Sequence, residues 1–421
     1  MDARDQNLLP RGCFYHRLQS GLEIIGQYLP GRKSVVCGCH INIGIAREPE
    51  EKQGLTAILK QLCSQSGAEM KKEEIDEYAG IHLEISTEPE RMLVLTQSVE
   101  TKLASSLGLL KAVLQAPMSP AVRLKELRLI VKQQIIRRRA NPVSRLMDAA
   151  GATFFRGTTL ARSPLGTLEG VERIELPDIH TFWKQYYQPD NLFFAVAGSF
   201  VWDEVVEQLQ ALFEDWRGHV LPLQPQCPSP VRNMVAIRQA SQQEHLCFMF
   251  PFPHYASADS YAAMLLRGVL MQRLFEALRG RHNLVYRITV DFISTQCSGY
   301  MRIYIGTLPE YTGECVRVVY DEIQHLEQEN LSADALALAK VKMKSENVFW
   351  SENTKNRFTS ITRSWWHERN FRTIDDIKQA VDAVTAEQIH KILQRFLPSS
   401  TLTLAALGPV EPEVALRCMA Q

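Results

Sequence analysis

Two segments of the chain, 210 residues apart, follow the same order of structural signals. The first starts a helix at Ile179-His180 and leads to the apolar strand Asn191–Gly198. The second starts at Ile389-His390 and leads to Thr401–Gly408, so both strands end on glycine. A helix–strand unit that recurs at one offset indicates a duplicated domain. The chain is therefore expected to fold into two domains of the same kind.

A proline-rich stretch separates the two halves. Pro222, Pro225, Pro228 and Pro230 follow one another closely, which is typical of an extended linker. A chain of 421 residues is also too long for one core of ordinary size. We expect an N-terminal domain over 1–217, a linker over 218–231 and a C-terminal domain over 232–421.

Composition limits the partners. Lys+Arg and Asp+Glu both number 47, and this balance argues against nucleic acid, which binds proteins with a positive excess. No run of 18 apolar residues predicts a membrane span, and the polar first ten residues do not resemble a signal or transit peptide. Nine cysteines, without a C-x-x-C pair and mostly in apolar segments, favour reduced thiols in the cytoplasm.

Strand-like and helix-like segments alternate along the first half. We expect a hairpin over 14–25, strands over 34–43, 81–87, 92–97 and 191–198, and helices over 54–66, 119–139 and 201–216. Ser119-Pro120 supplies a cap and a first-turn proline for the second of these helices.

The segment Gly54–Leu62 reads Gly-Leu-Thr-Ala-Ile-Leu-Lys-Gln-Leu. An ordinary core helix would explain these residues. They also resemble the frame G-L-[AT]-H-x-L-E-H-[LM] of the pitrilysin and mitochondrial-processing-peptidase family, whose H-x-x-E-H motif belongs to a zinc site. Ala57, Lys60 and Gln61 stand at the first His, the Glu and the second His. Alanine has no lone pair, lysine repels a cation, and an amide is a poor zinc ligand beside imidazole.

The resemblance extends over roughly residues 14–410. Arg162-Ser-Pro-Leu-Gly166 resembles the family's P-x-G stretch, and Tyr186–Gly198 resembles its Y-x-P-x-N block that ends on glycine. Arg273–Tyr286 resembles R-L-F-x-x-L-R-E-x-x-G-L-x-Y. The resemblance implies an α+β fold of two homologous domains. Each would be a mostly antiparallel sheet covered by helices, and the chain would form half of a clamshell of paired subunits.

A fourth position departs from the zinc site in the same way. Where active members carry a ligand Glu on the following long helix, this chain has Gln134. The four positions Ala57, Lys60, Gln61 and Gln134 are thus all degenerate. The resemblance implies that this chain holds no metal or other cofactor, and that zinc is bound by a partner subunit.

Arg279 and Tyr286 match the family's Arg/Tyr pair, which the second domain contributes opposite the zinc helix. A phenol O–H can stabilise the negative charge that grows on a peptide carbonyl oxygen, and a guanidinium can hold the peptide. A surface arginine and a packed tyrosine remain the simpler alternative. Gly280 and Asn283 replace a Glu and a Gly of the pattern, and asparagine tolerates positive φ.

Glu84, Ile85 and Ser86 occupy the edge-strand position where active members carry N-A-x-T and pair with substrate. Glu84 replaces the Asn. We expect these residues to be the place where a peptide would add to the sheet as an extra strand.

The resemblance implies a catalytically inactive subunit of a heterodimeric zinc peptidase in the cytoplasm of a bacterium. It would supply Arg279 and Tyr286 in trans to an H-x-x-E-H homologue, together with half of a chamber for peptide substrates. The alternative is a non-enzymatic scaffold, or a peptide-binding or chaperone protein of the same fold, in which both residues are dispensable. An enzyme of unrelated chemistry lacks support, since neither a phosphate loop nor G-x-S-x-G is present.

Overall fold

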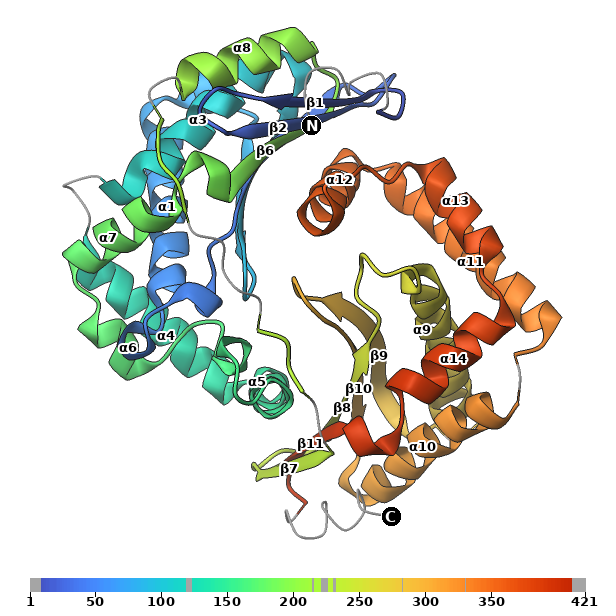
Figure 1. Cartoon of the computed structure of the whole chain (residues 1–421). Helices are drawn as coiled ribbons and strands as arrows, with labels where there is room; N and C mark the ends of the chain where they lie inside the picture. The colour runs from blue at the N-terminus through green and yellow to red at the C-terminus, as the bar shows by residue number, and fades with distance from the viewer. Residues whose placement is uncertain are drawn as a thin grey trace. The chain divides into compact units, whose positions relative to one another are not determined.

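The computed structural model describes residues 9–118, 123–213, 216–220, 226–229, 232–281, 283–329 and 331–410 (Figure 1). The expected cap at Ser119-Pro120 and three of the four linker prolines lie outside these residues. Among the described helices, none combines the length and apolar character needed to cross a membrane.

The chain divides into two compact units. Unit 1 comprises Met1–Ile135, Ser163–Gln224 and Phe349–Thr373, and unit 2 comprises Ile136–Arg162, Pro225–Val348 and Ile374–Gln421.

In unit 1, the described strands form one sheet in the order β1-β2-β6-β3-β5-β4. The strands are β1 (Cys13–Arg17), β2 (Glu23–Tyr28), β3 (Ser34–Ile41), β4 (His82–Thr87), β5 (Met92–Val99) and β6 (Leu192–Gly198). The β2–β6 pair is parallel, and the other neighbours are antiparallel. The predicted hairpin and the four predicted strands are thus confirmed, and β4 is an edge strand.

Unit 2 repeats this topology without a counterpart of β1. Its described strands have the order β7-β11-β8-β10-β9, and β7–β11 is the parallel pair. The strands are β7 (Asn233–Arg238), β8 (Glu244–Phe252), β9 (Val285–Ser294), β10 (Gly299–Thr307) and β11 (Thr403–Gly408). Strands β7, β11, β8, β10 and β9 take the places of β2, β6, β3, β5 and β4. The predicted duplication into two mostly antiparallel sheets is confirmed.

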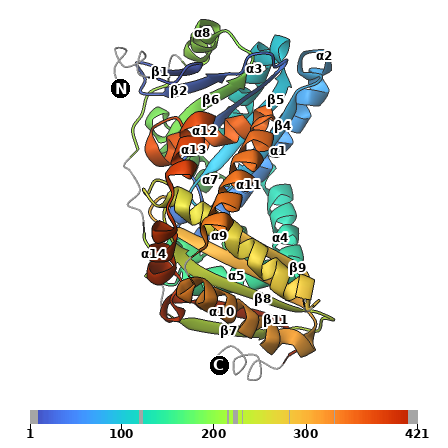
Figure 2. The same cartoon turned by 90° about the vertical axis from the view of Figure 1, so that its right-hand side faces the viewer.

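Helices flank both sheets (Figures 1 and 2). Unit 1 has α1 (Leu55–Glu73), α2 (Ile75–Tyr78), α3 (Leu103–Gln115), α6 (Leu168–Arg173), α7 (Leu176–Tyr186), α8 (Trp202–Leu212) and α12 (Thr354–Glu368). Unit 2 has α5 (Pro142–Phe154), α9 (Ser260–Phe275), α10 (Thr312–Gln328), α13 (Ile374–Ala383) and α14 (Ala386–Phe396). Helices α4 (Leu124–Ala140) and α11 (Ala333–Ser351) each cross from one unit's residues into the other's.

The repeated helix–strand unit has a physical basis at both ends. Helices α7 and α14 each begin with a capping box, which satisfies free amides of the first turn. At the other end, Gly198 has φ 125°, and a Cβ there would lie 2.2 Å from the Ser34 oxygen. A Cβ on Gly408 would lie 2.0 Å from Glu244 Oε2. Each strand therefore ends on glycine because another group occupies the space of a side chain.

Glu244 at the start of β8 is buried. Its Oε2 accepts a hydrogen bond from the Val410 amide at 3.3 Å. Burial raises the pKa of Glu244 to about 7, against the smaller opposing effect of that hydrogen bond.

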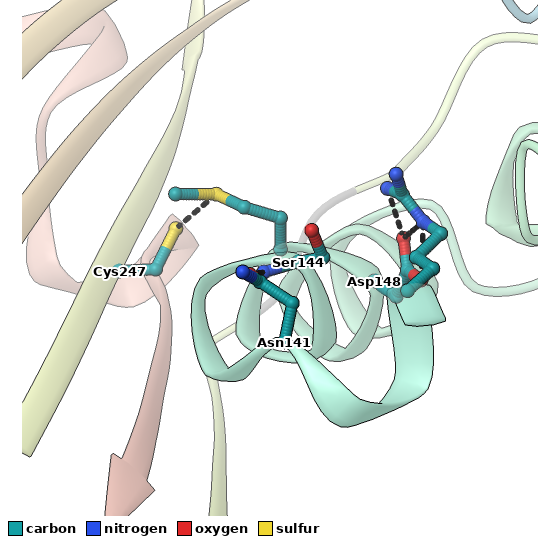
Figure 3. A network of polar contacts seen from close by, with 6 residues as sticks. Asn141, Ser144, Asp148 and Cys247 are labelled. Carbon is teal, nitrogen blue, oxygen red and sulfur yellow. Dashed lines mark hydrogen bonds and ion pairs between the residues drawn. The ribbon is translucent and has the colours of Figure 1, made fainter. Parts of the chain in front are cut away.

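Each unit contains one helix from the other half of the sequence. Helix α5 packs on β7, β8 and β11 in unit 2. Asn141 caps it by accepting a hydrogen bond from the Ser144 amide at 2.9 Å, and Arg138 forms a bidentate ion pair with Asp148 (Figure 3). The Cys247 thiol of β8 lies 3.9 Å from the sulfur of Met147 on α5.

Helix α12 covers one face of the unit 1 sheet, where it packs on β2, β3 and β6. Arg357 of α12 is buried and donates to Gln27 Oε1 at 3.0 and 2.7 Å. Side chains of β6 alternate between α12 and the helices of the opposite face. Phe193, Ala195 and Ala197 cluster with Phe358 and Trp365, whereas Leu192, Phe194 and Val196 join the larger core with α1 and α3.

The uninterrupted domain ranges expected from the sequence stay a prediction. The compact units differ from these ranges in the segments of α5 and α12.

Two cysteines depart from the expected reduced state. Cys227 and Cys297 form a disulfide, with their Cα atoms 5.7 Å apart. The other described cysteines are buried and form no disulfide: Cys13, Cys37, Cys39, Cys63, Cys247 and Cys315.

Candidate functional site

Helix α1 begins on a buried anion. The Glu48 carboxylate accepts hydrogen bonds from the Gly54 amide at 2.8 Å and from the Thr56 amide at 2.7 Å. A negative charge at this position stabilises the helix dipole and satisfies two amides that lack partners within the helix. Gly54 itself has φ 118°, and a Cβ there would lie 2.5 Å from Val171. The glycine of the Gly54–Leu62 frame is therefore required by local geometry.

Gly166, the glycine of the P-x-G stretch, lies against the start of the same helix. It has φ 76°, and a Cβ there would lie 2.3 Å from both the Gln53 oxygen and the Gly54 nitrogen. The two motifs, far apart in sequence, thus form one backbone contact that fixes where α1 begins.

Replacing Gly166 with alanine should destabilise unit 1 by about 3 kcal/mol or more, because positive φ and a backbone overlap add together. Gly80→Ala is the matched control, since Gly80 has φ 79° and open space around it. It should cost only about 1 kcal/mol. All six tryptophans fall in the residue ranges of unit 1, so urea unfolding followed by tryptophan fluorescence reports on this unit. Equal losses in the two variants would contradict the role of the backbone contact.

Two of the degenerate zinc positions, Gln61 on α1 and Gln134 on α4, lie in contact. Gln134 Nε2 donates to Gln61 Oε1 at 3.3 Å. Ala57 is buried, whereas Lys60 and Gln61 are partly exposed. Gln61 and Gln134 thus offer neutral amides, which Zn²⁺ fits poorly. Within the described residues, no group of three or more His, Cys, Asp and Glu side chains could hold a metal ion.

Arg279 and Tyr286 lie close to each other in unit 2. Arg279 belongs to the π-helical turn Glu276–Arg281 that follows α9, and Tyr286 is the second residue of β9. Arg279 Nη1 donates to the Tyr286 backbone oxygen at 3.5 Å. The Tyr286 side chain is 55% exposed, so its phenol is available to a ligand. Asn283 in the intervening turn has φ 50°, the left-handed conformation expected at the family's glycine.

A carboxylate holds the turn that carries Arg279 from both sides. Glu322 of α10 is largely buried and forms ion pairs with Arg281 at 3.0 Å and with Arg273 at 3.4 Å. Arg273 precedes the turn and Arg281 ends it. No sequence motif marks Glu322, because it lies 41 residues beyond Arg281.

Glu84, Ile85 and Ser86 lie on β4, which pairs with β5 along one side. Ile85 is buried, whereas Glu84 and Ser86 are partly exposed. Glu84 forms an ion pair with Lys355 of α12. A peptide adding to β4 would therefore meet a neutralised carboxylate. The sequence predicted the edge strand but not its pairing with Lys355, which is 271 residues away.

The sequence-predicted residues thus form two groups. The degenerate zinc positions and the β4 residues belong to unit 1, and Arg279 and Tyr286 belong to unit 2. A pair of duplicated mostly antiparallel units of this topology is a peptidase-like fold.

Comparison with known proteins agrees with this class. The family model of the insulinase family (peptidase family M16) matches residues 24–168, and the model of the peptidase M16 inactive domain matches residues 173–343. The chain therefore belongs to peptidase family M16.

Its relatives include an uncharacterized zinc protease of Streptomyces coelicolor. That protein is 22% identical over 417 residues, which cover 95% of this chain and 90% of the relative. A probable mitochondrial-processing peptidase subunit beta of Arabidopsis thaliana is 21% identical, over 94% of this chain and 78% of the relative.

Solved structures share the fold at low identity. A protease from Helicobacter pylori matches with a TM-score of 0.84 at 16% identity, over 95% of this chain and all of that one. A chain of complex III2 from Candida albicans matches with the same TM-score and identity, over 96% of this chain and 99% of that one.

Proposed function

We propose that this chain is the non-catalytic subunit of a heterodimeric zinc peptidase. The observation that carries the proposal is the contact between Gln61 and Gln134 at 3.3 Å. The two positions lie next to each other as a metal site requires, yet both carry amides. The scaffold of a zinc site is thus retained with different chemistry, which fits a subunit that leaves the metal to its partner.

The partner would be a homologous subunit with H-x-x-E-H, and zinc would be bound there. Arg279 and Tyr286 would act in trans on a peptide at the partner's metal. Zinc would polarise the scissile carbonyl and activate water. The Tyr286 phenol would donate a hydrogen bond to the developing oxyanion, and Arg279 would hold the peptide backbone. Substrates would be peptides or short unfolded segments, and the compartment would be the cytoplasm of a bacterium.

A scaffold or peptide-binding protein of the same fold is the second candidate. The Glu84–Lys355 ion pair favours it, since Glu84 is engaged with α12 at the position where active members carry the Asn of the substrate-pairing strand. In that case, the exposed Tyr286 phenol would have no catalytic role.

The purified chain alone should bind no stoichiometric zinc and cleave no peptide, because Ala57, Lys60, Gln61 and Gln134 offer no strong ligand. Mixed with an H-x-x-E-H homologue from the same source, it should form a heterodimer that cleaves an unstructured peptide. Metal analysis, size-exclusion chromatography and peptide cleavage measure the three properties. One tightly bound zinc in the isolated chain would contradict the proposal. A heterodimer no more active than the homologue alone would favour the scaffold.

The same purified chain also tests the peptide-binding alternative, because peptide binding and peptide cleavage are measured separately. If the chain binds unstructured peptide in the absence of any partner, while the mixture shows no cleavage, the peptide-binding function replaces the peptidase function. Restoring all four ligand positions together is not expected to yield an active subunit, since the groups that orient metal ligands would also be missing.

A further inference from the structure

Two cysteines of unit 2 differ from the rest in their access to solvent. Cys227 is exposed and Cys297 is partly exposed. Burial raises the pKa of the Cys37, Cys63 and Cys247 thiols to about 12, and that of Cys315 to about 11. The thiolate is the reactive form of cysteine, so these four are inert near neutral pH. The other described cysteines are all buried, so Cys227 and Cys297 are the described cysteines most accessible to a thiol reagent.

Cys297 is positioned by a turn that does not need its sulfur. It lies between β9 and β10, where the Thr295 amide donates to the Ser298 oxygen at 2.8 Å. The Ser298 amide donates to Thr295 Oγ1 at 3.1 Å, and His254 Nε2 donates to the Thr295 oxygen at 2.9 Å. None of these hydrogen bonds involves the Cys297 sulfur.

Two contacts place Cys227 beside Cys297. The neighbouring residue Gln226 makes one, and the Cys227 sulfur makes the other. Gln226 Oε1 accepts a hydrogen bond from the Thr159 amide at 2.8 Å. Cys227 Sγ lies 3.7 Å from the Cys297 carbonyl oxygen, close enough for a reduced S–H to donate to it. The Cα separation of 5.7 Å falls within the range that a disulfide requires. The backbone therefore holds the two cysteines within the range of a disulfide.

A small reagent can reach the pair. The two cysteines line a cavity of about 380 Å³, together with Phe252, His254, Arg395 and Phe396. Arg395 in this lining carries a positive charge that attracts an anionic thiol reagent. In a cytoplasm, where disulfides are uncommon and mostly transient, an accessible pair of this kind is suited to reversible oxidation.

We propose that Cys227 and Cys297 are a reversible thiol–disulfide site. The bond links Cys227, which lies within the proline-rich stretch, to the β9–β10 turn. The oxidant is a low-molecular-weight disulfide. The thiolate of one cysteine attacks it, forming a mixed disulfide and releasing one small thiol. The second cysteine then displaces the other small thiol, which leaves the protein disulfide and two reduced small molecules. Reduction by the same class of thiol reverses both steps.

The test uses the full chain with oxidised glutathione as the reagent. The fully reduced protein is incubated with it, alkylated without denaturation and then digested. Mass spectrometry should find the Cys227 peptide linked to the Cys297 peptide, with both alkylation sites lost together. Excess reduced glutathione should restore both. Cys227→Ser should instead leave Cys297 as a mixed disulfide with glutathione, because the second cysteine is missing.

A second readout follows the fold. The oxidised chain should melt at a temperature several degrees above the reduced chain by circular dichroism, since the bond closes a loop of 70 residues. The difference should vanish in Cys297→Ser. Cys13→Ser, at a buried position in unit 1, should keep the difference. The proposal fails if both thiols remain alkylatable after oxidation, or if the linked peptide forms only in denatured protein. None of these outcomes depends on peptidase activity.

Discussion

Tyr286→Phe in the reconstituted heterodimer should lower kcat by about 100-fold or somewhat less, while assembly and KM stay near their original values. The phenol would donate only to charge that appears in the transition state, so its loss affects the chemical step and not substrate binding. Removing one oxyanion donor costs 10²–10³ in rate in the best-studied case, roughly 3–4 kcal/mol. We expect the lower end, because zinc would carry much of the charge.

The exposure of Tyr286 makes this variant informative, since a 55% exposed side chain contributes little to the stability of the fold. Tyr28→Phe is a matched control, because Tyr28 is 41% exposed, lies on β2 and is not one of the candidate site residues. Arg279→Ala should raise KM as well as lower kcat, since the guanidinium would also hold the bound peptide. If both Tyr286→Phe and Arg279→Ala retained full kcat and KM, the action in trans would be wrong and the scaffold function would replace it.

Glu244→Gln should make unit 2 more stable at neutral and alkaline pH. The pKa of Glu244 is raised from 4.5 to about 7 by burial, so the folded state binds a proton that the unfolded state has released. The stability that this proton provides is full below about pH 4.5 and is lost as pH rises to about 7. One pKa unit corresponds to about 1.4 kcal/mol, so the loss between about pH 5 and pH 8 is about 2.5 kcal/mol.

Glutamine resembles the protonated carboxyl and does not titrate, so the variant should lack this part of the pH dependence. Urea unfolding monitored by circular dichroism at several pH values measures it, since the tryptophans lie in the ranges of unit 1. Glu310→Gln, at an exposed position of the same unit, should keep the original pH profile. A constant difference between Glu244→Gln and the unmodified chain across the range would contradict the burial of a titrating carboxyl.

The predictable parts of the structure were those with local or repeated signals. The hairpin, the strands and the duplicated helix–strand unit follow from alternation and from glycines whose space is occupied. The resemblance to a known frame singled out Gln61 and Gln134, which lie in contact, although neither residue marks a site by its own chemistry. Helix ends were predicted less well. The helix predicted over 54–66 runs to Glu73, and the helix predicted over 201–216 ends at Leu212.

The missing parts depend on contacts between distant residues. Glu322 pairs with two arginines across separate helices, and Lys355 pairs with Glu84 from another part of the chain. No short pattern records such pairs. The sequence did contain a partial signal for a helix such as α12, which comes from the other half of the chain. Strand β6 is apolar at every position, which indicates burial on both faces and therefore a cover for each.

The exchange of α5 and α12 affects how the chain can be made. The second face of the unit 1 sheet stays uncovered until α12 has been synthesised, near the end of the chain. Unit 2 likewise receives α5 from a segment made long before its own strands. Neither half of the gene therefore encodes a protein that could complete its own core, and the two units must mature together as one translation product.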